Sequence, residues 1–129
     1  MSTPFVTLTF GRIKEGRLDD FKRYNRLIAS LVEEQEPRVI AFHAMVTEDG
    51  ERFVGMQFHP DAASMEFHLE VVKDAVKEIG STLQIDAFKV LGPSSVAIDG
   101  MMAAMAASGI PVEHLPQHIS GFTRSSASD

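Results

Sequence analysis

Residues 39–59 read VIAFHAMVTEDGERFVGMQFH, a stretch that predicts a β-hairpin. Two runs rich in β-branched and aromatic residues, Val39–Thr47 and Arg52–His59, alternate their side chains with the period of a strand. Between them lies Asp49-Gly50, a pair favoured where a hairpin turn needs positive backbone dihedral angles. The turn sets the register of the two strands, and the rest of the fold is built around this hairpin.

The segments before and after the hairpin both have apolar residues at helical spacing. Upstream, apolar residues recur with a helical period from Leu18 until Pro37 stops the run. Downstream, a second helix is expected to bury a stripe running from Met65 to Ile79 and to end at Gly80. With strands over Phe5–Phe10 and Leu83–Leu91, the order becomes strand–helix–strand–strand–helix–strand. We therefore predict an α+β chain with a ferredoxin-like antiparallel sheet and two helices on one face.

The predicted strands are apolar on both faces. Val6 and Leu8 alternate onto one side of the first strand, while Thr7 and Thr9 take the other. Two helices cover one face of such a sheet, so the other face needs a partner. We expect a homodimer whose sheets face each other as a dimeric α+β barrel. The cavity between the sheets would be lined by mixed polar and apolar side chains: Thr7, Thr9, His43, Gln57 and His59.

The sequence continues beyond the predicted sheet. Ser94 or Ser95 can cap a third helix, on which Ile98 and three methionines share one face. Two short apolar pieces, Val112–Leu115 and Ile119–Thr123, are separated by Pro116, and both suit an edge strand or an arm laid on a partner subunit. We expect residues 1–91 to form the domain, residues 92–124 to extend it as a C-terminal helix and arm, and residues 125–129 to be disordered.

Composition narrows the class of protein. The chain has 129 residues, of which 44% are hydrophobic and 23% charged, as expected for one globular domain. A net charge of -6, without basic clusters, argues against a nucleic-acid partner or an anionic membrane. No segment has the pattern of a signal peptide or the length of a membrane span, and there is no cysteine. We expect a soluble protein in the reducing cytoplasm.

A family resemblance is carried by Arg52–His59, RFVGMQFH, and the helix start that follows, Asp61–Leu69, DAASMEFHL. This stretch resembles the antibiotic biosynthesis monooxygenase family of dimeric α+β barrels. Those proteins commonly have an Arg-Phe pair, a strand ending in an aromatic-Glu-x-Trp pattern, and a helix with a His-Leu pair. Here Gln57 takes the Glu position, His59 the Trp position and His68 the position of the histidine.

The resemblance covers about Phe5 to Leu91, and it implies a fold more firmly than a reaction. The family includes cofactor-independent oxygenases of quinols and anthrones, haem-degrading enzymes and members without known activity. Haem-degrading relatives use an Asn on the first strand and a Trp on the second helix. Thr9 and His68 take the comparable places here, and the chain has no Trp. The resemblance therefore favours an oxygenase that needs no cofactor.

Three histidines are the candidate catalytic residues. His68 is the first candidate for a base or an anion-stabilising donor, because histidine titrates in the useful range. The alternative is a helix histidine bonded to a neighbouring carbonyl. His43 and His59 are expected on the cavity face, where they form a polar cluster or bond between subunits. Candidate substrate-binding residues are Thr7, Thr9, Phe53, Gln57 and Phe88; for the threonines the alternative is that they are ordinary strand residues.

Two functions are compatible with this reading. One is a cofactor-free monooxygenase acting on a small aromatic, quinol or anthrone-like substrate. The other is a non-catalytic homodimer that binds a small hydrophobic or aromatic molecule. No metal is expected, because Pro116 separates His114 from His118 and no third ligand is nearby in sequence. Nothing resembles a phosphate loop or a nucleophile elbow.

Overall fold

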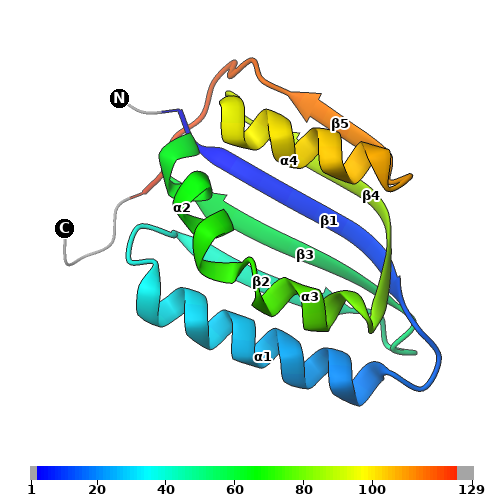
Figure 1. The fold of residues 1–129 in the computed structure, drawn as a ribbon. Helices are drawn as coiled ribbons and strands as arrows, with labels where there is room; N and C mark the ends of the chain where they lie inside the picture. The colour runs from blue at the N-terminus through cyan, green and yellow to red at the C-terminus, as the bar shows by residue number, and fades with distance from the viewer. Residues whose placement is uncertain (1–2, 125–129) are drawn as a thin grey trace.

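The computed structural model describes residues 3–124, in which a five-stranded sheet carries helices on one face (Figure 1). The predicted disorder of residues 125–129 lies outside the described residues. In chain order the elements are β1 (Phe5–Ile13), α1 (Leu18–Gln35), β2 (Ala41–Val46), β3 (Arg52–His59), α2 (Ala62–Val72), α3 (Ala75–Gly80), β4 (Leu83–Leu91), α4 (Val96–Ala107) and β5 (Val112–Leu115). The predicted ferredoxin-like order of strands and helices is confirmed.

The strands follow the order β2-β3-β1-β4-β5. Three pairings are antiparallel, and β5 lies parallel to β4. Thr7 of β1 pairs with Gln57 of β3, and Phe5 pairs with His59. Because directly opposite residues of paired strands share a face, these four side chains lie on the same side of the sheet. Phe5, Thr7 and His59 are buried there, so this is the face that the helices cover.

His43 lies on the opposite face, which corrects the expected cavity lining. The pairing of β2 with β3 sets Phe42 against Gln57 and His43 against Met56. His43 therefore points away from Thr7, Gln57 and His59. The face that carries Thr7, Gln57 and His59 is covered by the chain's own helices rather than by a partner's sheet. On this face His59 contacts Ser64 of α2.

All four helices lie on the same side of the sheet (Figure 1). On α1 the buried residues are Phe21, Ile28 and Val32, and the ring of Phe21 lies 5.0 Å from that of Phe53 on β3. On α4 the buried Ile98 packs into a cluster with Phe5 and three further residues: Met65, Phe88 and Val90. The chain thus builds its core between the helices and one face of the sheet.

The predicted second helix is divided into α2 and α3, with a turn at Lys73 and Asp74. Met65 and Val72 of the predicted stripe are buried on α2. Val76 on α3 is 44% exposed, contrary to the stripe. The turn after Val72 moves Val76 out of the buried stripe, whereas Ala75 and Ile79 still pack against the cluster that contains Val72.

The C-terminal extension joins the same sheet. Ser95 caps α4 by accepting a hydrogen bond from the backbone N–H of Ile98 at 3.3 Å. Met101, Met102 and Met105 pack against the cluster that contains Ile98. β5 is the predicted edge strand, whereas residues 116–124 form no strand.

The second face of the sheet carries apolar side chains that no helix among the described residues covers. By register this face includes Leu8, Met56 and His43, and on it Met45 and Phe58 are exposed. The expected dimeric barrel would use this face, and it stays a prediction. In residues 3–124, no helix combines the length and apolar character needed to cross a membrane.

Candidate functional site

Five polar side chains form a buried cluster between α1, α2 and β3. Gln57 and His59 come from β3, while Ser64 and His68 lie one turn apart on α2. Glu36 caps the C-terminus of α1, where the following Pro37 disfavours a further helical residue. Each of these side chains except Gln57 is almost completely inaccessible to solvent.

Glu36 and His68 make the closest contact of ionisable groups in the cluster. The Nδ1 atom of His68 lies 3.0 Å from Oε1 and 2.9 Å from Oε2 of Glu36. Both residues are 3% exposed. A buried carboxyl group facing an imidazole at this distance holds the ring in one orientation and shares a proton with it.

His59 links the pair to the start of α2. Its Nδ1 atom lies 2.8 Å from Ser64 Oγ, and its Nε2 atom lies 3.1 Å from Gln57 Oε1. The centroid of its ring is 5.7 Å from that of His68. Asp61 caps α2 by accepting a hydrogen bond from the backbone N–H of Ser64 at 3.0 Å.

An ion pair ties the cluster to the loop before β2. Arg38 pairs with Asp61, so the segment that carries Glu36 is held against the N-terminus of α2. The Arg38 guanidinium and the backbone N–H of Ser64 hold the pKa of Asp61 below its ordinary value. Asp61 therefore stays ionised and keeps both contacts near neutral pH.

Burial shifts the pKa values of the cluster in opposite directions. Desolvation raises the pKa of Glu36 to about 7. Desolvation lowers the pKa of His59 to about 4, and it lowers that of His68 to about 4 together with the nearby charge of His59. Both histidines are therefore neutral at neutral pH, and Glu36 is the group that titrates there.

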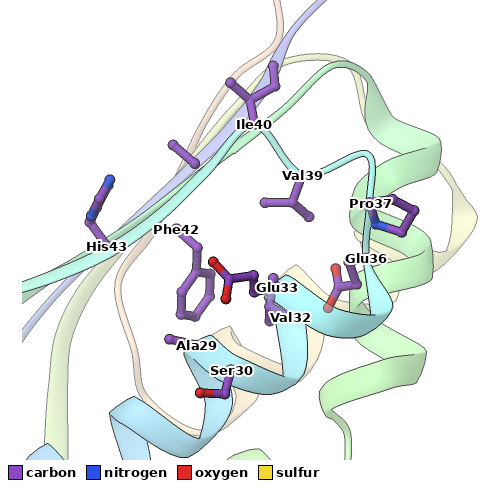
Figure 2. Close-up of a pocket in the computed structure, with 11 residues that line it drawn as sticks. Ala29, Ser30, Val32, Glu33, Glu36, Pro37, Val39, Ile40, Phe42 and His43 are labelled. Carbon is purple, nitrogen blue, oxygen red and sulfur yellow. The ribbon is translucent and has the colours of Figure 1, made fainter. Parts of the chain in front are cut away.

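Two cavities open beside the cluster, and Glu36 lines both. The larger, which we call the β2 cavity, has a volume of about 430 Å³ and lies between α1 and the free edge of β2. Figure 2 shows Phe42 pointing from β2 toward α1, whereas His43 points to the other side of the strand. The smaller, the Ser64 cavity, has a volume of about 310 Å³. Its lining comprises Gln35, Glu36, Pro37, Arg38, Ser64 and Phe67.

The structure brings together part of the predicted site. His59, Gln57 and His68 meet in the cluster, and Thr7 is buried beside Gln57 through the strand register. His43 is exposed and meets the β2 cavity from the other face of the sheet. His68 itself lines neither cavity and reaches them through Glu36.

The remaining predicted substrate-binding residues lie apart from the cavities beside Glu36. Phe88 is buried in the core beneath α4, and Thr9 pairs with it across β1 and β4. Phe53 packs on Phe21 and lines a separate cavity of about 390 Å³, together with Met45 and others. Their role as ligand contacts stays a prediction.

Glu36 and Ser64 are the members of the cluster that sequence reasoning missed. Glu36 ends an acidic run, Glu33 to Glu36, whose composition is typical of a solvated helix face. The available signal was its place before Pro37, where a helix must end and the chain turns. Ser64 has the character of an ordinary residue in the first turn of a helix. Residues 3–124 contain no group of three His, Asp or Glu side chains that could hold a metal ion.

Comparison with known proteins finds solved structures of similar fold. No family model matches the chain, and no curated protein matches it. MupZ from Pseudomonas fluorescens superposes with a TM-score of 0.70 at 19% identity, covering 93% of this chain and 96% of MupZ. Because residues 1–91 are fewer than three quarters of the chain, this match extends into the C-terminal extension.

Two further solved structures are similar over a smaller part of the chain. A protein assigned as an antibiotic biosynthesis monooxygenase from Bacteriodes thetaiotaomicron VPI-5482 gives a TM-score of 0.60 at 15% identity, covering 73% of this chain and 90% of that one. SnoaB from Streptomyces nogalater, a cofactor-independent oxygenase, gives a TM-score of 0.60 at 8% identity. The match covers 72% of this chain and 95% of SnoaB. At these identities the likeness establishes the fold alone.

Proposed function

The chain has the fold of the antibiotic biosynthesis monooxygenases, and from this premise we propose that it is a cofactor-independent monooxygenase. Its substrate is a small aromatic molecule, a quinol or an anthrone-like compound. The substrate binds in the Ser64 cavity, where Glu36 reaches it. The presence of a cofactor-independent oxygenase among the structural neighbours supports this reaction class.

The observation that carries the proposal is the buried Glu36–His68 pair. Glu36 lines the cavity, and its carboxyl group lies 2.9 Å from His68 Nδ1. A general base works best when its pKa is near the working pH, and burial brings the pKa of Glu36 to about 7. Glu36 is the base in this proposal. His68 is a positioning residue, which orients the carboxylate and donates its Nδ1–H to it.

The chemistry needs a substrate that becomes electron-rich when it loses a proton. Glu36 removes that proton, and the substrate anion then passes electrons to dioxygen and forms a carbon–oxygen bond. Loss of water from the resulting peroxide leaves a carbonyl group. Overall, one CH2 group of an anthrone, or of the keto tautomer of a quinol, and one O2 molecule give one C=O group and one water, so the substrate supplies all the electrons.

We also propose that the protein is a homodimer in the cytoplasm. The uncovered apolar face of the sheet supports the dimer, because burying such a face from water is favourable. The absence of cysteine from the chain suits a reducing compartment.

The test is dioxygen uptake by metal-free protein against a panel of quinols and anthrones. We expect uptake coupled to loss of substrate, and its loss in both Glu36→Gln and His68→Ala. His43→Ala serves as the comparison, because His43 lies on the other face of the sheet. If no compound is oxidised while several raise the melting temperature, the oxygenase is refuted and the protein is a small-molecule binding protein.

A further inference from the structure

The chain of contacts from Gln57 through His59 to Ser64 has no part in the proposed proton transfer, and it determines where hydrogens lie. Gln57 Oε1 is a carbonyl oxygen and can only accept, so the His59 nitrogen facing it at 3.1 Å, Nε2, carries a hydrogen. His59 is completely buried, and burial lowers its pKa to about 4. A neutral imidazole has one N–H, so Nδ1 is an acceptor.

Ser64 must therefore be the donor in its contact with His59. The Oγ atom of Ser64 lies 2.8 Å from His59 Nδ1, and the only hydrogen available to this contact is the hydroxyl hydrogen of Ser64. With that hydrogen committed, Ser64 can offer a ligand lone pairs and nothing else. A ligand that uses them has to bring a hydrogen of its own.

The surroundings of Ser64 specify the rest of the ligand. Ser64 lines the Ser64 cavity with Glu36, while Pro37 and Phe67 supply apolar walls. Phe67 is 52% exposed, so an aromatic face is available to an entering ring. The charge of Arg38 is already paired with Asp61, and no second cation lines the cavity.

We propose that Ser64 is a ligand-orienting acceptor that makes this cavity selective for an aromatic compound with a protonated hydroxyl group. A quinol donates one O–H to Ser64 Oγ and presents its second acidic hydrogen to Glu36, whereas a simple phenol has one O–H and makes the contact with Ser64 alone. A methyl ether of the same ring cannot donate. This inference deepens the proposed function, because it assumes that the Ser64 cavity holds the substrate.

The experiment is a calorimetric titration of the full chain without oxygen, using 1-naphthol and 1-methoxynaphthalene as a matched pair of probes. The measured quantity is the ratio of the two dissociation constants, which removes the apolar contribution that the rings share. We expect Ser64→Ala to reduce the preference for naphthol about fivefold, the worth of one ordinary hydrogen bond. Ser64→Thr keeps the hydroxyl and should keep the preference.

Ser30→Ala is the control, because Ser30 lines the β2 cavity and not the Ser64 cavity. It should leave the ratio unchanged. An unchanged ratio in Ser64→Ala, or no binding of naphthol to the wild-type chain, overturns the inference. A Ser64-dependent preference in a protein that consumes no oxygen would refute the oxygenase and leave this inference standing.

Discussion

Glu36 and His68 lie 32 residues apart in the chain and become partners because the end of α1 meets α2. Neither residue has unusual chemistry alone. Buried together, they place a carboxyl group with a pKa near 7 beside a histidine that stays neutral. That arrangement gives the site a group that can exchange a proton near neutral pH.

The first prediction concerns the pH dependence of oxygen uptake. Glu36 acts as a base only when ionised, so the rate should rise with pH through about 7 and level off above it. Glu36→Gln should lower the rate by roughly two to four orders of magnitude and remove the rise of the rate with pH. The measurement is initial dioxygen uptake against pH. If the rate of Glu36→Gln still rises with pH through about 7, the titrating group is another residue.

The second prediction concerns stability against pH. His59 and His68 have pKa values lowered from 6.5 to about 4, so below pH 6.5 the unfolded chain binds protons that the folded chain does not. Their contribution to the free energy of unfolding is complete above pH 6.5 and is lost as the pH falls toward 4. Each histidine contributes on the order of 1–3 kcal/mol.

The contribution of Glu36 to the free energy of unfolding changes with pH in the opposite direction. Its pKa is raised from 4.5 to about 7, so the stability that it contributes is complete below pH 4.5 and is lost as the pH rises through 7. Two histidines outweigh one carboxyl group, so stability should fall toward acid. In urea unfolding, the free energy of unfolding should fall less steeply toward acid pH in His59→Gln than in the wild type. It should fall more steeply in Glu36→Gln. Parallel curves in all three proteins would contradict these protonation states.

At the residue scale, sequence reasoning found His59, Gln57 and His68 but misplaced His43. Alternation along β2 correctly separates His43 from Phe42. Which of the two shares a face with Gln57 depends on the pairing register, and that register sets Phe42 against Gln57. Glu36 was missed because its burial is a tertiary effect, since an acidic helix end is exposed in most local contexts.

At the scale of elements, β1 bends at Gly11, where its register with β4 shifts. A Cβ atom at this position would lie 2.4 Å from the carbonyl oxygen of Gln84 and 2.6 Å from the ring of Phe53. Side chains and backbone therefore close around a glycine that has room for nothing larger. The ring of Phe53 that closes over Gly11 also packs against the ring of Phe21.

The third prediction is that Gly11→Ala lowers the free energy of unfolding by about 1–3 kcal/mol, the usual cost of overpacking a core. Gly55→Ala is the matched control, because Gly55 lies on the same face and a Cβ atom there would meet only Thr9 at an ordinary 3.7 Å. It should change stability by less than about 0.5 kcal/mol. The measurement is urea unfolding, and equal effects of the two substitutions would refute the tight contact.

Most elements were predictable because their patterns are local. The Asp49-Gly50 turn and the helical period before Pro37 each act within a few residues and are seen where they were expected. The helix cap was expected at Ser94 or Ser95, and Ser95 makes it. The turn at Lys73 and Asp74 was not predicted. No glycine or proline marks it, and the apolar period continues across it to Val76.

For the whole molecule, the fourth prediction is that the chain is a dimer through the uncovered face of its sheet. Light scattering at micromolar concentration should give twice the mass of the chain. Met56→Lys should give a monomer, because burying a charge at the middle of this face is unfavourable when no opposite charge pairs with it. Leu27→Lys is the control, since Leu27 is an exposed apolar residue on α1. A monomeric wild type, or a dimer that survives Met56→Lys, would refute the interface.

The short strand β5 has a consequence for misassembly. A long free edge invites pairing with other chains, and it is a common start for aggregation. β5 occupies the outer edge beside β4 with only four residues, and Pro111 and Pro116 stand on either side of it. Proline has no N–H to extend a ladder. Fibril growth by strand addition should therefore be suppressed on this side, leaving the six residues of β2 as the edge at which solubility is decided.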